Sequence, residues 1–145
     1  MSDLATIVAE HLPLLQTIND EQASRKPAPD VWSAKEILGH LIDSGVNNHA
    51  RFVRACAEDS LSLPGYDQKV WVSVGGYQQR DWADLLALWA AHQRQLAQVI
   101  ARLPDNALAH RLSIGGGERV TLDFVAQDYV AHQLHHLKQV RERVG

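Results

Sequence analysis

Apolar residues recur every three or four positions along most of the chain, which is the spacing of an α-helix with one buried face. One such segment starts with Ser33 and Glu36, the pattern of a capping box. Asp81 and Thr121 are placed to cap two others. Four long helices are predicted, over residues 4–20, 33–58, 81–103 and 121–140. Helices of this kind, packed by their apolar faces, predict an all-α four-helix bundle.

Two segments between the predicted helices lack a sustained period. Residues 59–79 contain a Pro-Gly and a Gly-Gly pair and predict a long loop between helices two and three. A loop of that length serves either as a lid over a binding site or as a packed connection between helices. Three consecutive glycines within residues 108–120 predict a flexible turn or a small hairpin.

The composition is that of one globular domain spanning residues 1–145, with 46% hydrophobic and 21% charged residues. A formal net charge of -3 offers no excess of positive charge to a phosphate backbone, so no nucleic-acid partner is expected. The longest strongly apolar stretch, residues 85–91, is far below the roughly 18 residues that span a bilayer, so no membrane association is expected either. An acidic N-terminal segment and a single cysteine predict a cytoplasmic location.

Histidine is the unusual feature of the composition, with eight copies. His132 and His136 are four residues apart on a predicted helix, so they project from one face with β-carbons about 5–6 Å apart and can share a metal ion. His135 also has helical spacing from His132, but the pair four residues apart shares a stripe with Val125 and Tyr129. The alternative is that these are ordinary surface or core histidines, because this motif also arises by chance.

A third candidate ligand, His40, lies on the second predicted helix. It stands between strongly apolar residues and begins a polar line that continues through Ser44, Asn47 and Arg51. Either this line faces water, or His40 is buried and then needs hydrogen-bond partners or a metal. Helical bundles build metal sites from inward side chains on facing helices, and three imidazoles leave coordination positions open.

Further residues are candidates for a pocket around this site. Asn47 and Arg51 could orient an anionic substrate, and the long loop contributes polar and aromatic residues that could close the pocket. Asp43 and Asp128 are candidates to orient an imidazole. The complete pocket prediction is Asn47, Arg51, Tyr66, Asp67, Trp71 and Tyr129.

Three stretches of the chain, in this order, resemble the DinB/YfiT-like superfamily of metalloenzymes over nearly the whole length. They are Trp32-Ser33-Ala34-Lys35-Glu36-Ile37-Leu38-Gly39-His40-Leu41, Leu63-Pro64-Gly65-Tyr66-Asp67-Gln68, and Tyr129-Val130-Ala131-His132 through His136. The resemblance implies a four-helix bundle, commonly a homodimer. It also implies a divalent metal, most often zinc or nickel, held by three histidines whose matching positions here are His40, His132 and His136. Some members are thiol-dependent transferases or isomerases that use a low-molecular-weight thiol.

The leading hypothesis is a metal-dependent enzyme that activates a thiol or water to attack a small electrophilic substrate, as in a stress or detoxification reaction. A non-catalytic protein that binds a metal or small ligand is the main alternative, and a metal-free helical interaction protein is a third. Because ligating imidazoles must be deprotonated, metal affinity is expected to fall as the pH drops through about 6.5.

Overall fold

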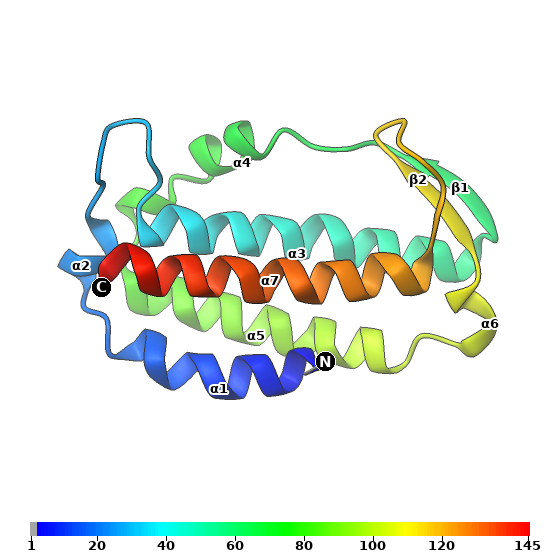
Figure 1. The fold of residues 1–145 in the computed structure, drawn as a ribbon, viewed down its shortest axis with the longest axis horizontal. Coiled ribbons are helices and arrows are strands. Elements are labelled where there is room, and N and C mark those ends of the chain that lie inside the picture. Colours follow the sequence, from blue (N-terminus) through cyan, green and yellow to red (C-terminus); the bar gives the residue numbers. More distant parts are fainter. Residues whose placement is uncertain (1–2) are drawn as a thin grey trace.

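The computed structural model describes residues 3–145, which form a bundle of four long helices with a small sheet at one end (Figure 1). The long helices are α1 (Leu4–Gln16), α3 (Ala34–Ala57), α5 (Trp82–Ala101) and α7 (Leu122–Val144). Helix α3 packs against both α5 and α7, and α1 packs against α5. The predicted helical bundle is therefore confirmed. Within residues 3–145 no helix is both long and apolar enough to cross a membrane.

Neighbouring helices α3 and α5 run in the same direction, and α7 runs opposite to both (Figure 1). Two hydrogen bonds between α5 and α7 agree with this. Trp89 of α5 donates to Gln133 of α7, and Tyr129 of α7 donates to Gln93 of α5. One turn forward along α5 therefore corresponds to one turn backward along α7. Parallel neighbours need a connection that returns along the bundle, as in bundles with a long crossover. This is why the chain between α3 and α5 is so long.

The start of α3 follows the predicted capping box. The Ser33 side chain accepts the backbone N–H of Glu36, whose carboxylate accepts the backbone N–H of Ser33. The first predicted helix, over residues 4–20, is too long at its C-terminal end, because α1 stops at Gln16. Asn19 then begins a separate short helix, α2 (Asp20–Ser24), with a capping box of its own. The competing cap at Asn19 explains the earlier end of α1.

The long loop predicted over residues 59–79 is a packed connection between α3 and α5 that has secondary structure of its own. This crossover contains strand β1 (Ser60–Leu63), helix α4 (Gln68–Gly75) and the 3-10 helix η1 (Tyr77–Gln79). Asp67 caps α4 by accepting two backbone N–H groups, and Gly76, with φ 66°, ends it in the left-handed conformation that glycine tolerates. Two turns of helix are too short to establish an apolar period in the sequence.

Of the flexible turn or small hairpin expected within residues 108–120, the structure shows the hairpin, and it belongs to a larger sheet. Strand β2 (Arg111–Ile114) pairs antiparallel with β3 (Val120–Thr121) and parallel with β1, while the short helix α6 (Asp105–Leu108) precedes it. Sequence spacing did not indicate the β1–β2 pairing, because it joins segments about fifty residues apart. The sheet therefore ties the crossover to the connection between α5 and α7.

At the end of the crossover that precedes α5, Tyr77 packs against α3. Its ring lies so close to the backbone at Gly39 and Gly75 that a β-carbon at either position would overlap the ring atoms. Its hydroxyl donates a 2.5 Å hydrogen bond to Oδ1 of Asp43. Tyr77 is buried. The two glycines therefore allow an aromatic ring to pack directly on the helix backbone.

Replacing Gly39 by alanine should destabilise the protein. Alanine favours helix by about 1 kcal/mol over glycine, but its methyl group would overlap the clamped Tyr77 ring, and overpacking of a core costs about 1–3 kcal/mol. We expect a net fall in the free energy of unfolding, measured by urea denaturation. Gly65→Ala is the control, because the nearest atom to its β-carbon would be 3.8 Å away. Equal stability of Gly39→Ala and the wild type would contradict this packing.

Candidate metal centre

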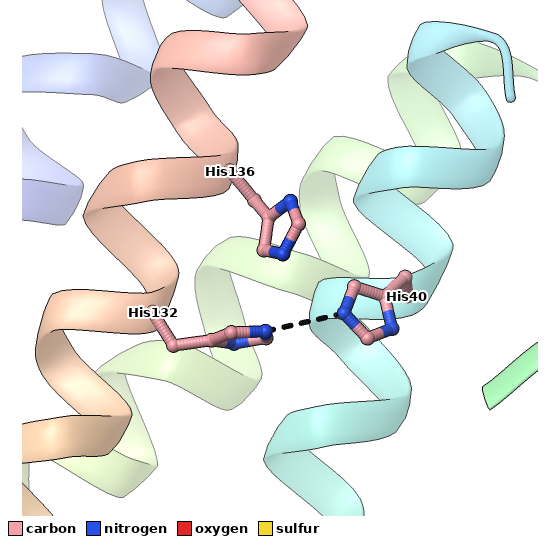
Figure 2. Close-up of side chains that lie close together, drawn as sticks. All are labelled: His40, His132 and His136. Carbon is pink, nitrogen blue, oxygen red and sulfur yellow. Dashed lines mark hydrogen bonds between the residues drawn. The ribbon is translucent and has the colours of Figure 1, made fainter. Parts of the chain in front are cut away.

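Three histidine rings converge between α3 and α7 (Figure 2). His40 comes from α3, and His132 and His136 come from successive turns of α7. The Nε2 atoms of His40 and His132 are 3.2 Å apart, and one ligand atom from each of the three rings lies within 4.8 Å of the others. The predicted set is therefore brought together, and His135 stays outside it as an exposed residue with its ring centroid 5.0 Å from that of His136.

The spacing of these nitrogens fits a metal ion. In a tetrahedral zinc site with Zn–N distances of about 2.0–2.1 Å, two ligand nitrogens stand about 3.3 Å apart. The 3.2 Å between the Nε2 atoms of His40 and His132 matches that separation. A neutral imidazole donor set suits several divalent metals, among them iron, nickel, copper and zinc. The described residues thus provide three ligands that could hold a divalent ion.

A hydrogen bond orients His136. Its Nδ1 lies 2.7 Å from Oε1 of Gln139, and because an amide oxygen only accepts, Nδ1 must carry the proton. The lone pair of Nε2 then faces the other two rings. Sequence reasoning missed Gln139, although its position three residues after His136 on a helix was a usable signal.

Burial keeps the cluster neutral. His40 is only 2% exposed, and loss of solvent, followed by repulsion from His132 and His136, lowers its pKa to about 4. Burial is also the main cause that lowers the pKa of His132 to about 4, although the negative charge of Asp128 opposes the shift. The pKa of His136 is lowered by burial too. His40 and His132 therefore stay in the neutral, metal-binding state well below neutral pH.

Asp43 lies one turn beyond His40 on α3 and is also buried. Burial raises the pKa of its carboxyl, and the hydrogen bond from Tyr77 opposes that shift. Two buried atoms here, Nδ1 of His40 and Oδ2 of Asp43, find no hydrogen-bond partner among residues 3–145. Asp43 was expected to orient an imidazole, but its carboxylate is engaged by the Tyr77 hydroxyl instead.

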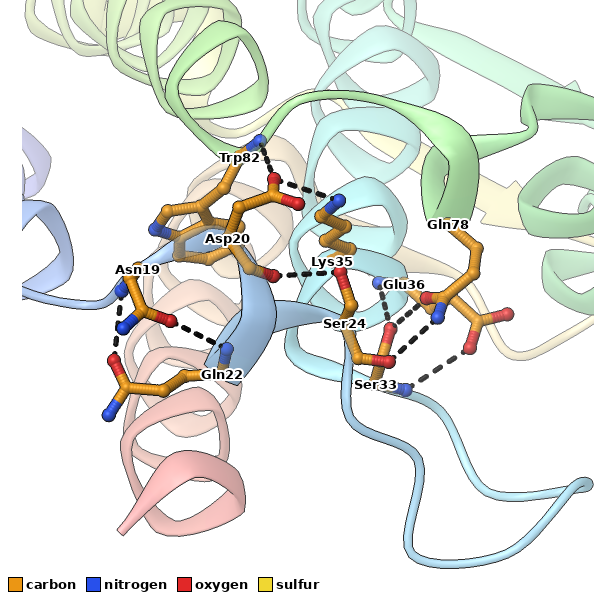
Figure 3. Close-up of polar contacts among 9 residues, drawn as sticks. All are labelled: Asn19, Asp20, Gln22, Ser24, Ser33, Lys35, Glu36, Gln78 and Trp82. Atoms are coloured by element: carbon orange, nitrogen blue, oxygen red, sulfur yellow. Dashed lines mark hydrogen bonds and ion pairs between the residues drawn. The ribbon is translucent and has the colours of Figure 1, made fainter.

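A polar cluster fixes the end of the bundle beside the histidines (Figure 3). Oδ1 of Asp20 accepts from the buried Lys35 ammonium and from the backbone N–H of Trp82, both at 2.9 Å. Asp81 occupies the predicted N-cap position of α5, but Asp20 accepts the first free N–H in its place. The hydrogen bond from Lys35 is the main cause that lowers the pKa of Asp20. The contact joins α2, α3 and α5.

The same cluster connects the crossover to the start of α3. The Gln78 side chain accepts from the Ser33 hydroxyl at 2.5 Å and donates to the backbone carbonyl of Ser24 at 2.8 Å. Ser33 precedes His40 by two turns of the same helix. The position of His40 along the bundle is therefore set by contacts with α2, η1 and α5 together.

A cleft of about 350 Å³ opens beside the cluster, with His40 and His132 in its wall. Three of the predicted pocket residues, Arg51, Tyr66 and Tyr129, line it as well. The hydroxyl of Tyr129 is not available to a ligand, because it is buried and donates to Gln93. Burial also raises the pKa of Tyr129. Its ring supplies part of the wall.

The other predicted pocket residues lie elsewhere. Asn47 donates to the backbone carbonyl of Asp43, and the neighbouring Asn48 lines the cleft in its place. Asp67 serves as the cap of α4, and Trp71 lies in a separate pocket, with its ring 5.8 Å from that of Tyr66. The prediction therefore located the polar face of α3 but not which asparagine faces inward.

The histidines outside the cluster have structural contacts. His11 is a core histidine, buried with Nδ1 2.9 Å from the carbonyl of Ile7. His110 is half-buried and its Nδ1 lies 2.6 Å from the carbonyl of Ala55. His49 and His92 face each other with ring centroids 5.8 Å apart.

The fold and the three-histidine cluster define a helical bundle with a candidate metal centre. The family model of the DinB superfamily matches residues 5–140, and the chain belongs to that superfamily. "Putative metal-dependent hydrolase YfiT" of Bacillus subtilis is 23% identical over 140 residues, covering 96% of this chain and 79% of the relative. A "Putative metal-dependent hydrolase" of Bacillus licheniformis is 26% identical over 138 residues, covering 88% and 75%.

Two solved structures share the fold. YfiT from Bacillus subtilis, described as "a probable metal-dependent hydrolase with an unusual four-helix bundle topology", superposes with a TM-score of 0.83 at 22% identity, covering 97% of this chain and 81% of that one. The DinB-like protein YjoA of Bacillus subtilis has a TM-score of 0.61 at 20% identity, covering 92% and 80%. Together they show that this chain has the bundle architecture of its superfamily.

The lowered histidine pKa values predict how stability depends on pH when metal is absent. An unfolded imidazole takes up a proton near pH 6.5, whereas the folded His40 does so near 4. Between these values the unfolded state binds more protons, so the free energy of unfolding falls as the pH drops. Loss of bound metal should likewise begin well below the pH of about 6.5 expected from an unperturbed imidazole.

Urea denaturation between pH 7 and pH 5 in the presence of a chelator measures this effect. The wild type should lose more stability than His40→Gln, by about 1 kcal/mol for each pH unit below about 6. His135→Gln changes an exposed ring that lowers the pKa of His132 and His136 but does not act on His40, so it should keep the part of the pH dependence that comes from His40. The same pH dependence in the wild type and His40→Gln would show that His40 titrates normally in the folded state.

Proposed function

We propose that this chain is a metal-dependent enzyme that hydrolyses a small-molecule substrate, with His40, His132 and His136 as ligands of a zinc or nickel ion. The observation that carries the proposal is the convergence of three buried or half-buried imidazoles, two of them with Nε2 atoms 3.2 Å apart. Two of the three, His40 and His132, also line a cleft. The names of the relatives, metal-dependent hydrolases, support the choice of reaction.

The chain's own residues suit this chemistry. When bound, a divalent ion supplies Lewis acidity and a nucleophile derived from water at neutral pH. Three protein ligands are the number typical of catalytic sites, in which a fourth position stays open. Asp128 provides a carboxylate in the cleft wall whose charge acts on His132, and we assign it the role of accepting a proton from the nucleophile. Tyr66 covers the cleft from the crossover.

The resemblance to thiol-dependent members implies a finer alternative within the same site. In that reaction a low-molecular-weight thiol, as cosubstrate, would replace water as the nucleophile, giving S-transfer or isomerisation with the same three ligands. A non-catalytic metal-binding role would require the open position to be closed by another ligand. The homodimer and the cytoplasmic location stay predictions.

Metal content tests the ligand set directly. Untagged wild-type protein incubated with zinc or nickel should retain about one ion per chain after desalting, as expected for three imidazole ligands. His40→Ala and His132→Ala should each lose it. His135→Ala is the matched control, because this neighbouring histidine is exposed and should leave the metal content unchanged. Retention of metal by His132→Ala, or its loss in His135→Ala, would contradict the assignment.

Activity then separates the possible reactions. The loaded protein should hydrolyse simple activated esters or amides, and the hydrolysis should disappear on chelation and in His132→Ala. Turnover that appears only after a low-molecular-weight thiol is added would favour S-transfer. A loaded protein that turns over neither kind of substrate, with all coordination positions occupied by protein atoms, would favour the non-catalytic role.

Gln139 should strengthen metal binding by holding His136 in the correct tautomer. Hydrogen-bond partners behind a ligand commonly contribute about 10–100-fold in metal affinity. We expect Gln139→Leu to weaken zinc binding at least about tenfold, measured by competition with a chromophoric chelator. Gln127→Leu is the control, because this exposed glutamine on the same helix bonds to Asp123. Equal affinities of the two variants would show that the Gln139 contact does not support the ligand.

A further inference from the structure

Arg51 lies at the far end of the cleft from the histidine cluster. It stands eleven residues after His40 on α3, which is about three turns and about 16 Å along the helix axis, on nearly the same face. Both residues line the same cleft. Antiparallel α7 supplies the opposite wall, with His132 and Asp128 near the cluster and Phe124 toward the sheet.

The side chain of Arg51 is held in place by neutral groups. Nη1 donates to Oδ1 of Asn48 at 3.4 Å, Nη2 donates to the carbonyl of Pro64 at 3.5 Å, and the guanidinium carbon lies 5.7 Å from the centre of the Tyr66 ring. These are long hydrogen bonds and an aromatic contact. They position the guanidinium and leave most of its five N–H donors free.

The guanidinium of Arg51 is in direct contact with no carboxylate of residues 3–145. The side chain is half-buried, and loss of solvent lowers its pKa. A partly desolvated cation without a partner is costly unless a ligand supplies the opposite charge. Arg51 therefore has the features of a group that is completed by an anion.

The remaining cleft residues make this end suitable for one charged group on an otherwise apolar ligand. Ser44 and Asn48 add polar side chains along α3, while Ile114, Val120 and Phe124 form an apolar wall near the sheet. The negative charge of Asp128 lies toward the other end, beside His132. An anion is thus favoured near Arg51 and disfavoured near Asp128.

We propose that Arg51 forms the specificity subsite for a substrate carboxylate, so that the enzyme acts on extended small molecules with a carboxylate remote from the bond that is attacked. The planar guanidinium matches a carboxylate through two parallel hydrogen bonds. A cleft of about 350 Å³ accommodates a short chain between the two ends and little more. The inference rests on the proposed metal-dependent function and names its substrate class.

Matched hydroxamic acids provide the probe, because the hydroxamate binds zinc whatever the substrate is. Zinc-loaded protein is titrated calorimetrically with two series of alkyl hydroxamic acids of increasing chain length, one ending in a carboxylate and the other in a methyl group. At the best length the wild type should bind the carboxylate form about tenfold more tightly or better. Arg51→Met, which keeps an unbranched apolar stem, should bind both forms within about twofold of each other.

Two further variants serve as controls. Arg51→Lys keeps the charge but loses the planar fork, so it should keep only part of the preference. Arg54→Met removes an exposed arginine from the same helix and should keep the whole preference. All variants should retain the wild-type zinc content and the wild-type affinity for the methyl form, which shows that they fold and that the metal centre is intact.

The outcomes separate the two proposals. Equal binding of the carboxylate and methyl forms by the wild type would overturn the carboxylate subsite while leaving the metal centre standing. A preference that survives in Arg51→Met would overturn the role of this arginine. Failure of both series to bind, together with absence of retained zinc, would overturn the proposed function and the inference with it.

Discussion

The parallel direction of α3 and α5 is the constraint on which the rest of this structure depends. Two adjacent parallel helices must be joined by a chain segment that runs back along the bundle, and here that segment covers α3 (Figure 1). Tyr77 packs on its backbone near one end and Tyr66 lies over the Arg51 end. The polar line along α3 is thereby converted from a face that would meet water into the wall of a cleft.

Covering α3 also explains the chemistry of the histidines. An imidazole removed from water resists protonation, and three imidazoles in contact resist it further, so the cluster stays neutral where free histidine would become charged. A divalent ion requires neutral imidazole nitrogens whose lone pairs point to one common position. The cost of burying them is moderated by the hydrogen bond from His136 to Gln139, while Nδ1 of His40 is buried without such a partner among residues 3–145.

The two ends of the cleft between α3 and α7 differ in charge. Near the cluster, neutral rings stand beside the negative charge of Asp128, which favours a cation there. At the opposite end, Arg51 is held by neutral acceptors and an aromatic ring, so its charge is left for a ligand. His40 and Arg51 mark the two ends of the cleft on α3. Their separation along the helix axis sets the length of ligand that fits.

The features that the sequence predicted correctly are those fixed by local helix geometry. A helical period and its caps predict α3 and α7 closely, and the four-residue spacing of His132 and His136 places them on one face whatever they pack against. By contrast, the rotation of one helix against another, the β1–β2 pairing and the inward position of Asn48 instead of Asn47 depend on contacts between distant segments. Those contacts are decided by packing of the whole core, so only the tertiary structure could bring His40 to the pair and leave Arg51 without a carboxylate in direct contact among the described residues.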